Sequence, residues 1–224
     1  QFSGLEIIPG IELSSVLYDE EVHILGYYLN PLDDNLQSAL KGFRKDRECT
    51  IKQMVEKLSE SRVYLDWERV LEIAGDGAIG RPHIAYAMLE KGYIKDFAEA
   101  FDKYIGRLGI GYVERKKITS DQACRLITGA GGVPVLAHPK YLKSPGKIVE
   151  FLIPYGLSGV EVYYARHSPH DIEIFHAIAQ QYALLPCGGS DYHGTGTLGE
   201  KIPGEMGPPL WVTSELSRIS QKFR

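Results

Sequence analysis

The sequence predicts an α/β fold that is interrupted by a helical insertion. After about residue 130, apolar segments rich in Ile, Val, Leu and Tyr alternate with amphipathic segments, as they do in parallel sheets and barrels. Two similar strand-like segments lie near the start of the chain, and a long stretch of helical periodicity separates them from the later ones. We therefore expect residues 1–34 and 131–224 to form one discontinuous α/β domain, a parallel sheet or a barrel, and residues 35–130 to form a helical insertion domain.

The first two strands are expected at residues 5–15 (LEIIPGIELSS) and 21–29 (EVHILGYYL), because both segments are rich in apolar β-forming residues. The Pro, Asn and Asp residues of the next segment, NPLDDN, indicate a loop. From Leu36 onward, apolar residues recur at three- and four-residue steps, which is typical of a helix.

Further helices of the insertion are expected from their end signals. Asp66 is expected to cap the start of one helix, with Gly75 beyond its end. Another helix carries Pro82 in its first turn and Gly92 after its last turn. The remaining helical segments are DFAEAFDKYIG and TSDQACRLITGAGG.

The later part of the chain is expected to contain strands at 132–138 (GVPVLAH), 157–164 (LSGVEVYY) and 184–191 (LLPCGGSD). Helices are expected between them, at 144–156 and 168–183. In parallel β/α folds the loops that follow the C-terminal ends of the strands build the active site.

Composition narrows the class of function. With a net charge of -4, the chain has no excess of basic residues of the kind that binds nucleic-acid phosphates, so we expect no stable duplex nucleic-acid partner. No apolar run approaches the roughly 18 residues that span a bilayer, and the N-terminus lacks a signal-peptide pattern, so we expect no membrane partner. The three cysteines are isolated in the sequence, which favours a reducing compartment and a cytoplasmic location over a disulfide framework or a cysteine zinc site.

Five potential metal ligands fall at the ends of the expected strands. Within the first strand segment, IIPGIE ends at Glu12; His138 ends the strand GVPVLAH, and the last strand segment, LLPCGGSDYH, ends with Asp191 and His193. His23 opens its strand, and it would face the same edge if that strand ran antiparallel to its neighbours. Such a mixed N/O set suits Zn, Mn or Fe, and carboxylate-rich versions suit Mn or Mg.

Each of these residues, taken singly, is also explained as a solvated loop residue or a helix cap. Their joint position at strand ends is harder to explain in that way. The residues alone therefore leave two interpretations, a metal site and a set of unrelated polar residues.

The segments PGIE, VHILGYY, GRPHIA, VLAHP and GGSDYHG resemble the PHP (polymerase and histidinol phosphatase) superfamily over essentially the whole chain. The likeness is strongest to the phosphoesterases that include nucleoside 3′,5′-bisphosphate phosphatases and 5′–3′ oligoribonucleases. It implies a distorted (β/α)7 barrel with two or three divalent metal ions, Mn, Mg, Zn or Fe. It also implies Glu12 as a bridging carboxylate, His23, His138, Asp191 and His193 as further metal ligands, and catalytic roles for Glu12, Asp191 and His193.

The sequence departs from the family pattern at its start. That pattern opens with a His-x-His strand, followed by an Asp and a TDH motif, and none of these precedes PGIE in this sequence. We therefore expect an N-terminally truncated barrel, and we expect this 224-residue chain by itself to bind metal weakly and to have little activity.

The segment GRPH at residues 80–83 has two interpretations. It is a plain helix start with a surface arginine, or a phosphate site in which Arg81 supplies a guanidinium fork at a helix N-terminus. The resemblance favours the second, and we expect Arg81 and His83 to bind a non-scissile phosphate of the substrate.

The function that these features predict is a metal-dependent phosphoesterase. The resemblance implies that a metal-activated hydroxide hydrolyses phosphate monoesters of small nucleotides of the 3′,5′-bisphosphate type, or short oligonucleotides. The alternatives are a histidinol-phosphate or other small-molecule phosphatase of the same superfamily, and a non-catalytic PHP domain. A Ser-His-Asp hydrolase is disfavoured because no Gly-x-Ser-x-Gly motif is present.

Overall fold

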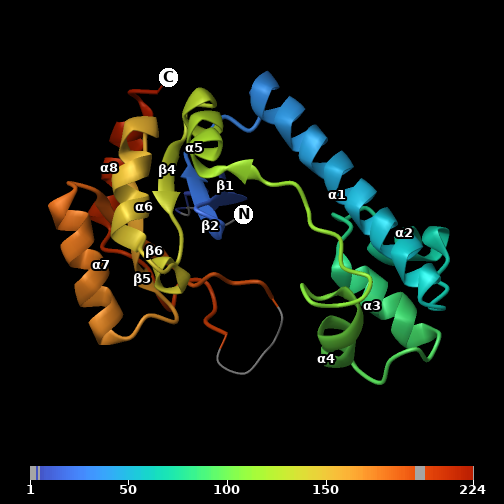
Figure 1. Cartoon of the computed structure of the whole chain (residues 1–224). Helices are drawn as coiled ribbons and strands as arrows, with labels where there is room; N and C mark the ends of the chain where they lie inside the picture. Colours follow the sequence, from blue (N-terminus) through green and yellow to red (C-terminus); the bar gives the residue numbers. More distant parts are fainter. Residues whose placement is uncertain (1–3, 5, 195–199, 224) are drawn as a thin grey trace. The chain divides into compact units, whose positions relative to one another are not determined.

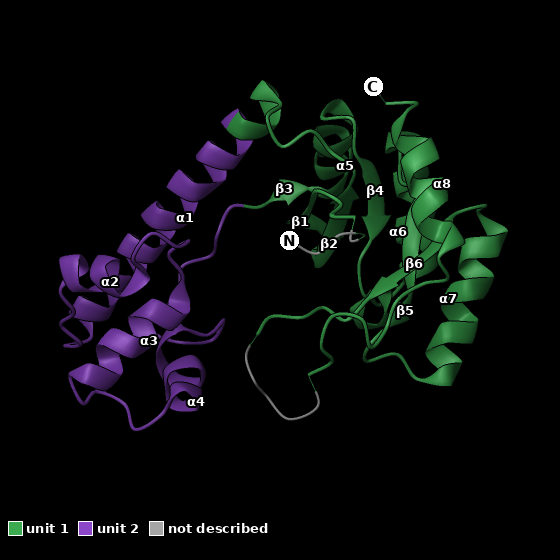
Figure 2. Ribbon diagram, turned by 180° about the vertical axis from the view of Figure 1, so that it is seen from behind, with its two compact units in different colours: residues 1–37, 117–224 green, residues 38–116 purple. Residues whose placement is uncertain are grey.

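The computed structural model describes residues 4, 6–194 and 200–223, and it divides the chain into two compact units. Unit 1 consists of Gln1–Gln37 and Lys117–Arg224, and unit 2 consists of Ser38–Lys116 (Figure 2). Within the described part of the chain, no helix has the length and apolar character needed to cross a membrane.

Unit 1 is built on a six-stranded sheet with the strand order β3-β1-β2-β4-β5-β6 (Figure 1). Strand β2 is antiparallel to both of its neighbours, whereas the other neighbouring strands pair in parallel. The strands are β1 (Gly10–Leu17), β2 (Glu20–Tyr27), β3 (Ile118–Thr119), β4 (Val133–Leu136), β5 (Gly159–Tyr164) and β6 (Leu185–Gly189).

Helix α5 covers one face of this sheet. Gly26 of β2 lies so close to Ile127 of α5 that a Cβ atom at Gly26 would be 2.9 Å from the isoleucine side chain. On the same face, the hydroxyls of Ser15 and Ser120 lie 2.8 Å apart. Helix α7 packs against β5 and β6. The longer helices of unit 1 are α5 (Ser120–Gly129), α6 (Pro145–Leu152), α7 (Pro169–Gln181) and α8 (Trp211–Ser220).

Helix α8 packs on the opposite face of the sheet. Its residues Val212 and Leu216 share a buried cluster with Val133 and Val135 of β4 and Cys187 of β6. The partly buried Leu25 and Tyr27 of β2 pack against the same cluster. Because side chains alternate along a strand, His23 lies on this same face as Leu25 and Tyr27. Sequence analysis did not identify α8.

Unit 2 is helical and has a hydrophobic core of its own. Asp66 caps α2 by accepting a hydrogen bond from the Glu68 N–H, and Gly75 ends that helix, as predicted. Helix α3 has a proline in its first turn, also as predicted. The helices are α1 (Asp34–Glu60), which begins within unit 1, α2 (Trp67–Ala74), α3 (Arg81–Glu90), α4 (Phe97–Glu99) and a π-helical turn (Ala100–Ile105).

The units divide the chain differently from the expected insertion of residues 35–130. Helix α5 and the short strand β3 lie in unit 1, because unit 2 ends at Lys116. The physical reason is that Ala123, Cys124 and Ile127 form the apolar side of α5, which is buried against β1, β2 and β4. Helical periodicity alone does not show which domain a helix packs on.

Candidate metal centre

Three of the predicted ligands converge in unit 1. The Nδ1 atom of His23 lies 2.7 Å from Oε1 of Glu12 and 3.2 Å from Nε2 of His138. The same Glu12 oxygen lies 3.4 Å from Nε2 of His138. Glu12, His23 and His138 thus each direct one possible ligand atom toward the same point.

The strand directions explain how the two histidines meet. His23 lies near the start of β2, and His138 follows the end of β4. Because these strands are antiparallel, the start of one meets the end of the other, and the Ala137 N–H donates to the His23 carbonyl at 3.0 Å. The predicted condition for His23 to face the common edge, an antiparallel strand, is confirmed.

Glu12 reaches the site in another way than expected. It is the third residue of β1, not the last residue of a strand, because pairing with β2 begins at Gly10. Pro9, which has no N–H to add to a ladder, precedes the strand. Glu12 pairs with Leu25, so its side chain lies on the same sheet face as His23 and extends along that face.

His138 has a strained backbone that a buried carboxylate supports. Its φ and ψ angles are 27° and 59°, in the left-handed region that non-glycine residues rarely adopt. The His138 N–H donates to Oε2 of Glu161 at 2.7 Å. Glu161, on the neighbouring strand β5, is only 5% exposed. We infer that Glu161 holds the end of β4 in the conformation that presents the His138 ring.

The ring of His23 lies between two carboxylates. Its Nε2 atom is 3.2 Å from Glu21, and Glu21 is itself paired with Lys117 at 2.6 Å. A carboxylate on the far nitrogen of a histidine ring fixes the tautomer and the ring orientation of metal ligands. Without metal, the Nδ1–H of His23 donates to Glu12; with a metal bound, a proton held on Nε2 by Glu21 would leave the Nδ1 lone pair for the ion.

The charges at the site shift the pKa values of its members. Hydrogen bonds from His138 and His23 hold the pKa of the Glu12 carboxyl far below its usual range. The hydrogen bond to Glu12 raises the pKa of His23, although burial acts in the opposite direction. Burial raises the pKa of Glu161 to about 7, although the His138 N–H favours its ionised form.

The donor set fits a divalent transition metal. Atoms bound to one ion at about 2.0–2.2 Å lie about 3.0–3.5 Å from one another. The two contacts of His138 Nε2, at 3.2 and 3.4 Å, match that spacing, whereas the 2.7 Å between His23 Nδ1 and Glu12 is that of a direct hydrogen bond. Two imidazoles and one carboxylate are a ligand set for Zn, Mn or Fe.

The other two predicted ligands lie outside this triad. Asp191 accepts a hydrogen bond from the Tyr164 hydroxyl at 3.2 Å, and the Tyr164 ring lies 5.8 Å from the His138 ring. His193 is largely exposed, and its Nδ1 lies 2.8 Å from the Asp191 carbonyl. Asp191 has a φ of 52°, so the backbone at this residue is not extended.

Arg81 and His83 belong to unit 2 and make local contacts there. The Gly80 N–H donates to Nδ1 of His83 at 2.9 Å, and this bond caps the start of α3. The Arg81 guanidinium lies 5.4 Å from the centre of the Phe101 ring and 3.5 Å from the Ile105 carbonyl.

Comparison with known proteins gives the family. No family model matches the sequence. The 5′-3′ exoribonuclease Rnm of Salmonella typhimurium is 31% identical, over 98% of this chain and 75% of that protein. The chain belongs to the PHP family of metal-dependent phosphoesterases. The 3′,5′-nucleoside bisphosphate phosphatase of Chromobacterium violaceum is 29% identical, over 96% of this chain and 75% of that protein.

A solved structure supports the same assignment. A protein from Bifidobacterium adolescentis, described as a metal-dependent phosphoesterase, superposes with a TM-score of 0.81 at 29% identity. The match covers 96% of this chain and 77% of that chain. The predicted PHP-type α/β barrel fold and the predicted enzyme class, a metal-dependent phosphoesterase, are confirmed.

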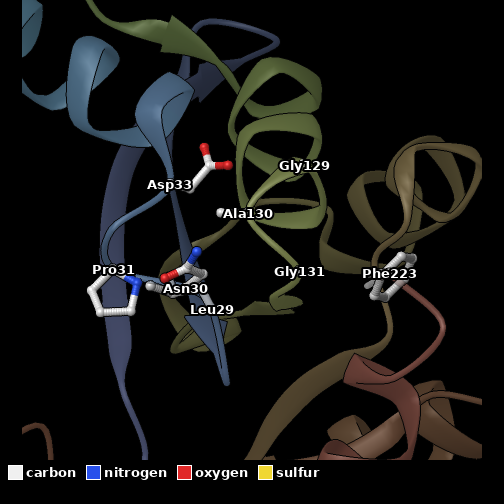
Figure 3. Close-up of a pocket in the computed structure, with 8 residues that line it drawn as sticks. All are labelled: Leu29, Asn30, Pro31, Asp33, Gly129, Ala130, Gly131 and Phe223. Carbon is white, nitrogen blue, oxygen red and sulfur yellow. The ribbon is translucent and has the colours of Figure 1, made fainter.

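A separate pocket of about 560 Å³ lies at the other end of the strands (Figure 3). Leu29 follows the end of β2 and Gly131 precedes β4, whereas His23 and His138 lie at the opposite ends of these two strands. The N-terminal ends of parallel strands contribute to stability and not to catalysis in such folds. The lining residues are Leu29, Asn30, Pro31, Asp33, Gly129, Ala130, Gly131 and Phe223.

Sequence reasoning missed two carboxylates of the site. Glu21 is two residues before His23, so strand alternation places both on one face. Glu161 is a charged residue inside the apolar segment GVEVYY, and a buried charge requires a partner. Both signals were present in the sequence.

Proposed function

We propose that this PHP-family protein hydrolyses phosphate monoesters of small nucleotides of the 3′,5′-bisphosphate type, or of short oligonucleotides. The observation that carries the proposal is the convergence of Glu12, His23 and His138, three donors that fit a divalent metal. A bound divalent metal supplies Lewis-acid chemistry toward a phosphoryl group. The relatives named above support a nucleotide substrate.

The chain's own residues would arrange this site. Glu21 orients the His23 ring, and Glu161 positions His138, so both imidazoles are held before metal binds. The net charge of -4 gives the chain no excess of basic residues, which agrees with a small phosphorylated substrate and with the absence of a duplex nucleic-acid partner. The proposal includes two or three ions, with manganese among the candidates, and a cytoplasmic location.

Asp191 and His193 are proposed as further ligands with catalytic roles, by motif match. In support, Tyr164 contacts both Asp191, through its hydroxyl, and His138, through its ring. The Nδ1 atom of His193 contacts the Asp191 carbonyl, which leaves its Nε2 atom for a ligand. Arg81 and His83 are proposed to bind the non-scissile phosphate, supported by their position in the first turn of α3.

A phosphate-release panel tests the proposal. The full chain is assayed with Mn²⁺, Mg²⁺ or Zn²⁺ on adenosine 3′,5′-bisphosphate, AMP, histidinol phosphate, phosphotyrosine and short 5′-phosphorylated RNA. We expect metal-dependent release that is slow, because the sequence predicts weak metal binding by this chain alone, and that is greatest from the nucleotide substrates. His23→Gln should lower this release by at least about 100-fold, because it removes a ligand nitrogen.

His170→Gln is the matched control, since His170 is largely exposed on α7 and should keep wild-type release. Release that needs no metal, or that survives His23→Gln, would contradict the proposal. Preference for histidinol phosphate or phosphotyrosine would assign the site to another phosphatase of the family.

A further inference from the structure

An exposed tyrosine lies directly beside the candidate metal centre. Tyr141 ends the short turn Pro139–Tyr141 that follows His138. Its ring centre lies 5.8 Å from that of His138 and 6.4 Å from that of Tyr164, with interplanar angles of 62° and 82°. Neither contact is face-to-face stacking, and Tyr141 is 58% exposed. The Tyr141 ring therefore contacts its aromatic neighbours in edge-to-face geometry, and much of the side chain remains exposed to solvent.

The structure beneath this ring is rigidly built. Tyr164 is 2% exposed, and its hydroxyl donates to Asp191. The Nζ atom of Lys140 donates to the Arg166 carbonyl at 3.0 Å and to Asp171 at 2.9 Å. These bonds join the turn that carries Tyr141 to the loop that follows β5 and to the first turn of α7. A platform that is ordered before binding loses little conformational entropy when a ligand stacks on it.

A positive charge lies next to the ring. The hydrogen bond with Tyr141 raises the pKa of the Arg166 guanidinium, which is exposed. Among the described residues, no carboxylate lies within ion-pair distance of that guanidinium. The charge of Asp191 also acts on the guanidinium without an ion pair, so the Arg166 charge is only partly offset and can attract an anionic ligand.

We propose that Tyr141 is the base-stacking platform of a nucleotide subsite beside the metal centre. Aromatic rings bind nucleobases by stacking without requiring a particular base, because every base has a π face. Tyr141 follows His138 by three residues, so a nucleotide whose phosphate is at the triad has this ring as an aromatic neighbour. This inference rests on the proposed function and adds the residue that distinguishes nucleotides from other phosphate monoesters.

Binding measurements test the subsite independently of turnover. Calorimetric titrations in Mn²⁺ compare AMP with ribose 5-phosphate, which has the same ribose phosphate without a base. We expect the wild-type chain to bind AMP about 10-fold more tightly or better. Tyr141→Ala should remove this preference, and Tyr141→Phe should keep it, because the stacking ring remains.

Tyr18→Ala is the matched control. Tyr18 is 62% exposed in the same unit, and its ring packs against Phe151 of α6. Circular dichroism and bound Mn²⁺ establish that each variant is folded and loaded. The inference is overturned if Tyr141→Ala keeps the preference, if Tyr141→Phe loses it equally, or if the wild type shows none. Metal-dependent release from nucleotides together with any of these results would leave the proposed function standing.

Discussion

At the scale of single residues, His23 determines how the site responds to pH. It lies between Glu12 and Glu21, and the hydrogen bond to Glu12 raises its pKa above the usual value of 6.5. Either protonated His23 or a bound metal can neutralise the charge of the Glu12 carboxylate. Only neutral His23, however, can offer its Nδ1 lone pair to a metal. Protons and metal therefore compete for one nitrogen.

Metal affinity is expected to rise with pH through the raised pKa of His23. Affinity should increase by up to about 10-fold per pH unit below the folded pKa of His23, which lies above 6.5, and should level off above that pKa, with release of a proton on binding at the lower pH values. Calorimetric titration in buffers of different ionisation enthalpy measures both quantities. An affinity that is the same across this range would show that His23 is not a ligand.

The same shifts set the stability of the metal-free protein. Because the folded pKa of His23 is raised, its contribution is complete below pH 6.5 and is lost as the pH rises through the folded pKa. The pKa of Glu12 is lowered, so its contribution is present above pH 4.5 and is lost as the pH falls. The stabilising effect of this pair is therefore greatest between those limits.

At the scale of secondary structure, the strands decide which polar residues meet. Antiparallel β2 brings the start of one strand to the end of another, and this places His23 beside His138. Strand β5 then supplies Glu161, which supports the strained end of β4. The helix caps at Asp66 and Ser168 were predictable, because each cap is formed by residues close in sequence.

The variants Glu161→Gln and Glu161→Leu are expected to separate two contributions of Glu161 to the free energy of unfolding, its hydrogen bond with the His138 N–H and its negative charge. Leucine leaves the His138 N–H without its acceptor, which should cost about 1–3 kcal/mol of unfolding free energy. Glutamine keeps an acceptor. Because the pKa of Glu161 is raised to about 7, its ionisation costs stability as the pH rises from 4.5 to about 7, so Gln should equal or exceed Glu above that range.

Urea unfolding of the metal-free variants measures these differences. A Gln variant as unstable as the Leu variant would show that the hydrogen bond to His138 is not what Glu161 contributes.

At the scale of the whole molecule, the chain forms two units with separate cores. The donors of the triad all belong to unit 1. A ligand that binds only the folded form stabilises the part of the protein whose unfolding would release it.

Metal is therefore expected to protect unit 1 selectively in hydrogen exchange. Amides of β1, β2 and β4 should exchange more slowly in Mn²⁺, while those in the core of unit 2 should be unchanged. Mass spectrometry of peptic fragments, with and without metal, provides the measurement. Equal protection of both units would show that they unfold together.

The sequence by itself determined the α/β class, most helices and strands, and five candidate residues of types suited to a metal, because periodicity, caps and residue type are local signals. Tertiary structure decided which residues form the triad, that α5 packs in unit 1, and that α8 covers one end of the face that carries His23. It also revealed Glu21 and Glu161 as supports. These features depend on strand direction and on contacts between residues far apart in the chain, such as Glu12 and His138, which no local pattern specifies.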